Sequence, residues 1–125
     1  MKFLLDTHLL LWWLADSPQL SAAARDAIAD QNNTVFVSAV SLWEVWLKVS
    51  LGKLRLPPEF DEVLAAQPFE ALPLTAAHAR ELGSLPWLHR DPFDRMLVAQ
   101  AISARLTLLT ADSAVGGYGP AVMVV

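Results

Sequence analysis

The sequence contains no cysteine among its 125 residues. This absence excludes a disulfide framework and any metal site built from thiolates. It also fits a reducing compartment, and we therefore expect a cytoplasmic protein.

Long apolar runs are also absent. The longest, residues 9–15, has seven residues, whereas a membrane-spanning helix needs about 20. The N-terminal segment carries one Lys and a short apolar run before Asp6, which is not the pattern of a signal peptide. There is no internal repeat, low-complexity tract or linker. We expect a single domain over residues 1–125, with no membrane association.

Apolar residues are nevertheless abundant. They make up 54% of the chain and include five Trp, and the mean hydropathy is +0.38. These values are high for a soluble monomer. Two interpretations remain open: a dense core with helices on both faces of a sheet, or an apolar surface that a partner chain covers.

Acidic residues exceed basic ones by four, 13 against 9, so the net charge is −4. Four carboxylates at special positions, described below, equal this excess (13 − 9 = 4). One or two divalent cations bound to them would neutralise it locally. The acidic balance therefore does not argue against a polyanionic substrate.

Strand-like and helix-like segments alternate along the chain. We expect strands at residues 2–6, 34–37, 69–72, 106–109 and 121–125, and helices at 8–15, 21–30, 38 or 41 to 51, 59–66, 75–85 and 92–105. Ser38 and Ser41 are both candidate caps of the helix that ends near residue 51. This order predicts a three-layer α/β/α fold around a mostly parallel sheet of four to five strands. Residues 69–72 are flanked by prolines, which favours a strand at the edge of the sheet.

Four carboxylates lie where these elements end or begin. Asp6 and Asp112 follow strands, Asp94 lies in the first turn of a helix, and Glu44 lies about two turns into another helix. Ligands of open parallel sheets bind beyond the carboxyl ends of the strands. We therefore expect these side chains to converge there, and converging carboxylates require a cation.

Each carboxylate also has a purely structural interpretation. Asp6 could cap the next helix, although Thr7 is the cap that we expect there. Glu44 completes the capping-box pattern Ser41-x-x-Glu44. Asp94 would complement a helix dipole, and Asp112 would serve in a turn. The apolar neighbours of Glu44 favour a functional role, because a lone carboxylate is costly among them. Helix spacing also places Lys48 beside Glu44, so a partly exposed Glu44 next to Lys48 is the alternative.

The expected ligands are all oxygen atoms. Such ligands suit Mg²⁺ or Mn²⁺ better than zinc. Two such ions about 3.5–4 Å apart can flank a displacement at phosphorus. The pattern thus points to metal-dependent phosphoryl chemistry.

Taken together, these motifs resemble the PIN domain family and, more narrowly, the VapC toxins of bacterial type II toxin–antitoxin pairs. The resemblance covers essentially the whole chain in order and spacing. Its most specific part is the segment Asp-Pro-Phe-Asp-Arg at residues 91–95; the others are Asp6-Thr7, Ser41-x-x-Glu44 and Thr110-x-Asp112.

The resemblance implies a Mg²⁺-dependent endoribonuclease that cleaves RNA with a metal-activated water. Asp6, Glu44, Asp94 and Asp112 would form its catalytic metal site, with Asp6 and Asp94 as principal ligands. Thr110 would orient a ligand or phosphate. The expected partners are RNA, a second copy of the chain in a homodimer, and a VapB-like antitoxin that also binds promoter DNA.

Several further residues have two interpretations each. Asp91 competes with Asp94 as a ligand, but its place before Pro92 favours a helix cap. Arg95 either contacts substrate phosphate or pairs with a neighbouring acid. His89 lies close enough in sequence to approach the site, although a loop histidine without catalytic work is the commoner case. Tryptophans on the helices at 8–15 and 41–51 could line a groove for an amphipathic antitoxin segment.

Two other functions use the same acidic pocket. A phosphoacceptor domain of the receiver type needs a Lys that reaches the pocket from a late strand, and no Lys follows Lys53. A non-catalytic binding module would act through its apolar surface, but all four acids are present. We therefore favour the nuclease.

Overall fold

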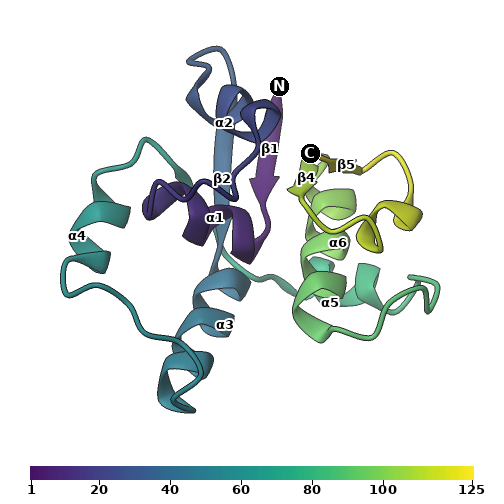
Figure 1. Cartoon of the computed structure of the whole chain (residues 1–125). Coiled ribbons are helices and arrows are strands. Elements are labelled where there is room, and N and C mark those ends of the chain that lie inside the picture. The colour runs from purple at the N-terminus through teal and green to yellow at the C-terminus, as the bar shows by residue number, and fades with distance from the viewer.

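The structure, a computed structural model, describes residues 1–125 and combines a central sheet with surrounding helices (Figure 1). In chain order the elements are β1 (Lys2–Leu5), α1 (Thr7–Leu14), α2 (Ala22–Ala29), β2 (Thr34–Ser38), α3 (Ala39–Ser50), α4 (Phe60–Ala65), β3 (Glu70–Leu72), α5 (Ala76–Leu82), α6 (Pro92–Ala104), β4 (Thr107–Thr110), the 3-10 helix η1 (Val115–Tyr118) and β5 (Val122–Val124). None of the helices has the length and apolar character needed to span a membrane.

The five strands form one sheet in the order β3-β2-β1-β4-β5. Every neighbouring pair is parallel. The central strand β1 places Leu4 opposite Phe36 of β2 and Leu108 of β4. The expected α/β class is confirmed, and β3 is an edge strand as predicted.

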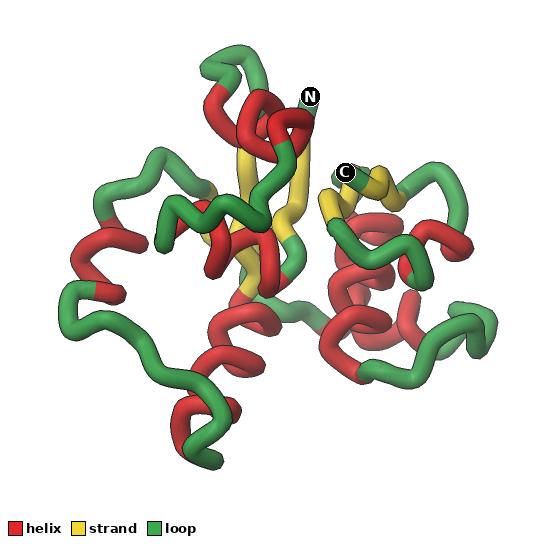
Figure 2. Tube along the Cα trace, in the orientation of Figure 1, coloured by secondary structure: helices red, strands yellow, loops and turns green.

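Side chains of β1 alternate between two apolar layers. Phe3 and Leu5 belong to a cluster with α1 and α2. Leu4 belongs to a second cluster, in which Leu97 and Val98 of α6 take part. Both faces of the sheet are therefore covered, which is why its strands are apolar throughout rather than alternating. Figure 2 shows helices around the central strands, whereas the edge strands β3 and β5 are partly exposed.

Polar side chains fix where α1 and α3 begin. Asp6 caps α1, because its side chain accepts from the backbone N–H of Leu9; the expectation of Thr7 as the cap was wrong. Ser38 caps α3, so Ser41 lies inside that helix and the capping-box explanation of Glu44 is also wrong. Thr7 is the first helical residue of α1, one position after the cap.

The order of the strands creates a switch point beside β1. The chain first adds β2 and β3 on one side of β1, then crosses to place β4 and β5 on the other. Adjacent parallel strands with diverging connections leave a crevice at their carboxyl ends. α6 returns between α5 and β4, so its first turn lies at the same edge (Figure 1).

Candidate active site

Asp6 lies at the carboxyl end of β1, in the crevice beside β4. Its backbone N–H donates to Leu109 O over 3.1 Å, and its Oδ1 accepts from Leu9 N over 2.8 Å. Burial raises the pKa of Asp6, hydrogen bonds from Thr110 and Leu9 act against this, and the charge of Asp94 raises it further. Asp6 is therefore a poorly solvated carboxyl group whose charge interacts with that of Asp94.

Asp94 occupies the first turn of α6. Asp91, the N-cap, accepts from Asp94 N over 2.9 Å, so the prediction that Asp91 is a cap is confirmed. Burial is the main cause that raises the pKa of Asp94; a hydrogen bond to His89 lowers it, and the charges of Asp91 and Glu44 raise it. Asp94 is thus the acid that both Asp6 and Glu44 approach.

Glu44 is buried on α3, with 4% of its surface exposed. Lys48 Nζ lies 2.7 Å from Glu44 Oε2, but Glu44 Oε1 is buried and has no hydrogen-bond partner. An unpartnered buried carboxylate oxygen is costly. A cation in the pocket would remove this cost, and in that respect the oxygen donors present fit a hard divalent ion.

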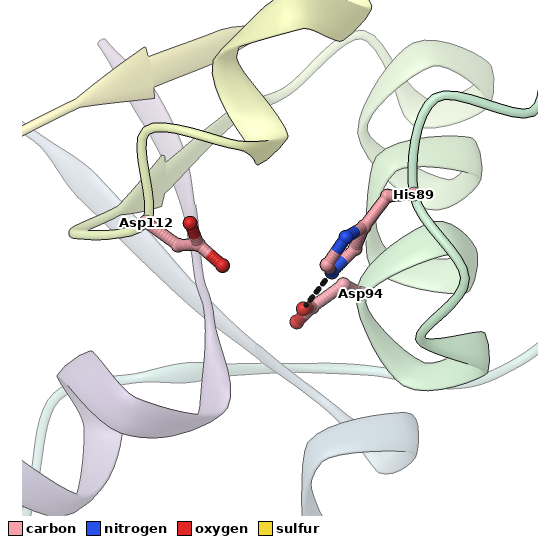
Figure 3. A group of neighbouring side chains, drawn as sticks. All are labelled: His89, Asp94 and Asp112. Carbon is pink, nitrogen blue, oxygen red and sulfur yellow. Dashed lines mark hydrogen bonds and ion pairs between the residues drawn. The ribbon is translucent and has the colours of Figure 1, made fainter.

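His89 brings an imidazole to the same pocket. Its Nε2 lies 2.9 Å from Asp94 Oδ2, and ligand atoms of His89, Asp94 and Asp112 all lie within 4.8 Å of one another (Figure 3). Sequence reasoning gave His89 little weight, because a histidine in a loop has no periodic or capping signal. Only its position two residues before the Asp91 cap hinted at this contact.

The carboxylates are brought together in two groups. The ligand atoms of Asp94, Asp112 and His89 form the tightest group. Asp6 and Glu44 lie outside this group, but their charges interact with that of Asp94. The tightest potential ligand set therefore differs from the expected pair of Asp6 and Asp94. That ranking of ligands stays a prediction.

Thr110 connects two of the acids. It is buried at the end of β4, and its hydroxyl oxygen accepts from Asp112 N over 3.0 Å. Its side chain also lies close to Asp6, where it lowers the pKa of that carboxyl group against the effect of burial. Thr110 thus links the Asp112 turn to Asp6. The expected contact between Thr110 and a substrate phosphate stays a prediction.

Arg95 faces away from the carboxylates. Its side chain is buried, and Nη1 donates to Pro86 O over 2.7 Å and to the Tyr118 hydroxyl over 2.9 Å. Its guanidinium carbon lies 3.8 Å from the centre of the Trp87 ring. Neither an ion pair with a neighbouring acid nor an exposed position for substrate phosphate is seen. Arg95 instead anchors the loop that carries His89.

A second cavity of about 540 Å³ lies between α1, α3 and the segment leading into α4. Apolar side chains of α1 and α4 line it, among them Leu11, Trp12 and Phe60, and Lys53 and Arg55 stand at its wall. Of the tryptophans expected to line a groove, only Trp12 does so: Trp43 packs on Phe93 and Trp46 on Phe60, and Trp13 Nε1 donates to Gln67.

Comparison with known proteins gives consistent results. The PIN domain model matches residues 3–116. Ribonuclease VapC22 of Mycobacterium tuberculosis is 31% identical over 122 residues, covering 87% of this chain and 85% of the relative.

Solved structures share the fold. VapBC2 from Rickettsia felis, bound to a promoter DNA fragment, has a TM-score of 0.74 at 19% identity and covers 99% of this chain and 97% of its own. A toxin–antitoxin complex from Klebsiella pneumoniae gives 0.67 at 19% identity, with 96% and 94% covered. FitAcB from Neisseria gonorrhoeae gives 0.66 at 21% identity, with 90% and 89% covered.

Proposed function

This chain belongs to the PIN domain family, and from that premise we propose that it is a VapC-type endoribonuclease, the toxin of a type II toxin–antitoxin pair. Its similarity to Ribonuclease VapC22 over most of the chain supports a nuclease. We further propose that residues 1–125 act as a single domain in the cytoplasm and depend on Mg²⁺, with Mn²⁺ as a substitute.

The observation that carries this proposal is the convergence of buried acids at the switch point of the sheet. Burial raises the pKa of Asp6 and of Asp94, the charge of Asp94 adds to the rise at Asp6, the charges of Asp91 and Glu44 add to the rise at Asp94, and Glu44 Oε1 has no partner. A fold does not keep such groups together for stability, because each of them costs free energy. A divalent cation would make all of them favourable at once.

The cation would be held by Asp6, Glu44, Asp94 and Asp112. When bound, a divalent ion supplies an activated water and neutralises charge that develops on the phosphate. Asp6 and Asp94 serve as principal ligands, and Glu44 and Asp112 complete the site directly or through water. No residue of the chain becomes covalently modified.

Other residues of the chain position this site. His89 holds Asp94 through the 2.9 Å contact, and Lys48 neutralises one oxygen of Glu44 while leaving the other free. Thr110 fixes Asp6 relative to Asp112. Hydrogen bonds of this kind orient ligands and often matter almost as much as the ligands.

The direct test is cleavage of RNA by the purified chain. We expect cleavage that requires Mg²⁺, stops on chelation and falls by at least about 100-fold in Asp6→Asn, as loss of a principal electrostatic group does. Sequencing of RNA ends after induction of the wild type and Asp6→Asn would locate the cuts. Full activity of Asp6→Asn, or undiminished cleavage in the presence of EDTA, would contradict the proposal.

We propose that the α1–α3–α4 cavity receives an amphipathic segment of the antitoxin. Its apolar lining with Lys53 and Arg55 at the wall suits a segment with apolar and acidic faces. Similar structures are toxin–antitoxin complexes, one of them bound to promoter DNA, so we expect promoter contacts through the antitoxin and a homodimer of this chain.

The antitoxin proposal can be tested by copurification. A Trp12→Ala substitution removes an apolar wall of the cavity and should weaken binding of the antitoxin encoded beside this chain. Leu74→Ala changes an exposed side chain outside the cavity and serves as the control. Equal copurification with both variants would place the antitoxin elsewhere.

A further inference from the structure

The loop between α5 and α6 divides its side chains between two sites. His89 contacts Asp94 in the acidic pocket. Trp87 and Arg90, on either side of it in the sequence, line a separate cavity of about 360 Å³. Pro92 and Arg95 of α6 line the same cavity. One short loop therefore joins the candidate catalytic pocket to a neighbouring hollow that the proposed chemistry does not use.

Trp87 is held in place although it is exposed. With 79% exposure it is the most exposed large apolar residue of the chain, yet the Arg95 guanidinium stacks 3.8 Å from its ring centre. Arg95 is itself fixed by its bonds to Pro86 O and the Tyr118 hydroxyl. The indole is thus pre-organised on one face and open on the other, as an aromatic platform for stacking is.

The cavity differs in charge from the rest of the molecule. The chain has a net charge of −4, but two arginines and no carboxylate line this cavity; the remaining lining residues are apolar or glycine, namely Ala79, Leu82, Gly83, Leu85, Trp87 and Pro92. Apolar walls with an aromatic ring and the exposed guanidinium of Arg90 match a nucleobase, whose faces are apolar and whose edges and phosphate accept hydrogen bonds.

Its position also suits a substrate strand. Arg90, which lines the cavity, and His89, which contacts Asp94, are consecutive residues of the exposed α5–α6 loop, and consecutive Cα atoms are about 3.8 Å apart. An RNA strand with its scissile phosphate beside Asp94 would carry a neighbouring base past the α5–α6 loop.

We propose that this cavity is a nucleobase subsite of the nuclease, in which an unpaired base next to the scissile phosphate stacks on the open face of Trp87 and Arg90 contacts its edge or phosphate. The inference rests on the proposed nuclease function and adds a determinant of which RNA bond is cut. It requires single-stranded RNA, because a paired base is not available for stacking on a side chain.

The first experiment uses cleavage of a random-sequence, single-stranded RNA pool, followed by sequencing of the ends. The wild type should show a base preference at one position beside the cut. Trp87→Ala should lose that preference and about tenfold in kcat/KM, as removal of one stacked base does, while Trp87→Phe should retain most of both. Trp46→Ala alters an exposed tryptophan of α3 outside the cavity and should match the wild type.

The second experiment separates this inference from the nuclease proposal. Fluorescence anisotropy with eight-nucleotide single strands of uniform sequence measures binding to Asp6→Asn protein in EDTA, where no cleavage occurs. Adding Trp87→Ala should weaken binding about tenfold. If the wild type cleaves no RNA while binding still depends on Trp87, the subsite stands and the nuclease proposal fails.

Two results would overturn the subsite. One is unchanged base preference and unchanged binding in Trp87→Ala, with RNA cleavage intact. The other is a dimer that dissociates on Trp87→Ala substitution, measured by light scattering, which would show that a second copy covers the indole.

Discussion

At the scale of single residues, the candidate site opposes the stability of the fold. Asp6 is buried at 5% exposure and Glu44 at 4%, and one oxygen of Glu44 has no partner. Burial raises the pKa of Asp6 and of Asp94, which means that their charged forms are destabilised. Sites that concentrate such groups are typical of function rather than of packing.

Substitution of Asp6 should therefore separate stability from activity. Asp6→Asn removes the buried charge but keeps a side chain that can cap α1, since Asn caps helices about as well as Asp. In EDTA, we expect the melting temperature of Asp6→Asn to exceed that of the wild type by a few degrees. Differential scanning calorimetry measures this. Asp6→Ala also loses the helix cap, so its free energy of unfolding should be about 1 kcal/mol lower than that of Asp6→Asn.

The same pKa shifts predict how stability depends on pH without metal. Because the pKa values of Asp6 and Asp94 are raised in the folded state, the folded protein binds these protons more tightly than the unfolded chain. The two charged carboxylates therefore lower the free energy of unfolding at neutral pH. This loss of stability disappears as the pH falls through the folded-state pKa values towards the ordinary carboxyl pKa near 4. We therefore expect urea unfolding in EDTA to show that Asp6→Asn/Asp94→Asn exceeds the wild type in free energy of unfolding by most at pH 7.5 and by least near pH 4. A gain that grows on acidification would contradict the assignment.

His89 should matter through Asp94. Removal of a hydrogen bond that orients a ligand typically costs about 10–100-fold in metal affinity or activity. We expect His89→Ala to raise the Mn²⁺ concentration for half-maximal binding, measured by calorimetry, by that factor. Arg25 pairs with Asp16 and with none of the pocket residues, so Arg25→Ala should leave the affinity unchanged.

At the scale of elements, helix caps and candidate ligands are combined in the same turns. Asp6 ends β1, caps α1 and faces the pocket. Asp91 caps α6 and thereby fixes Asp94 three residues later. The local signals that start a helix therefore also aim the functional carboxylates.

Loss of the α6 cap should reduce both the stability of the fold and the cleavage activity. Asp91→Ala should lower the free energy of unfolding by about 1 kcal/mol and reduce cleavage, because Asp94 N loses its acceptor. Asp91→Ser supplies another capping oxygen and should restore most of the stability in urea titrations. It should also restore most of the activity, which would distinguish a cap from a metal ligand; stability without activity in Asp91→Ser would make Asp91 a ligand.

At the scale of the whole molecule, the sheet order decides where the acids meet. β1 and β4 are adjacent although about one hundred residues separate them, and α3 and α6 bring Glu44 and Asp94 to the same crevice. The metal would thus be bound by segments from both ends of the chain. Binding to the native state alone stabilises it by mass action.

Divalent ions should accordingly stabilise the whole fold. We expect 10 mM Mg²⁺ to raise the melting temperature of the wild type above that in NaCl of equal ionic strength. The rise should vanish in Asp6→Asn/Asp94→Asn, in which the principal ligands lose their charge. Differential scanning fluorimetry measures both, and an equal rise in the double variant would show that Mg²⁺ binds elsewhere.

The sequence by itself determined the class of fold and the identity of the acids. Apolar β-branched runs, the Asp91-Pro92 start signal and the order of elements predicted the parallel sheet, and the prolines around residues 69–72 predicted its edge strand, because these patterns are local. Boundaries shifted by a few residues where two caps competed, as with Thr7 against Asp6 and Ser41 against Ser38.

Only the tertiary structure decided what the polar side chains contact. That His89 reaches Asp94, that Arg95 turns to Pro86 and Tyr118, and that Trp87 stays exposed over a cavity depend on how a loop folds over α6. Such contacts join groups through space and carry no periodicity in the sequence. The sequence thus specified which charged residues the protein carries, and tertiary packing specified which of them lie together in one pocket.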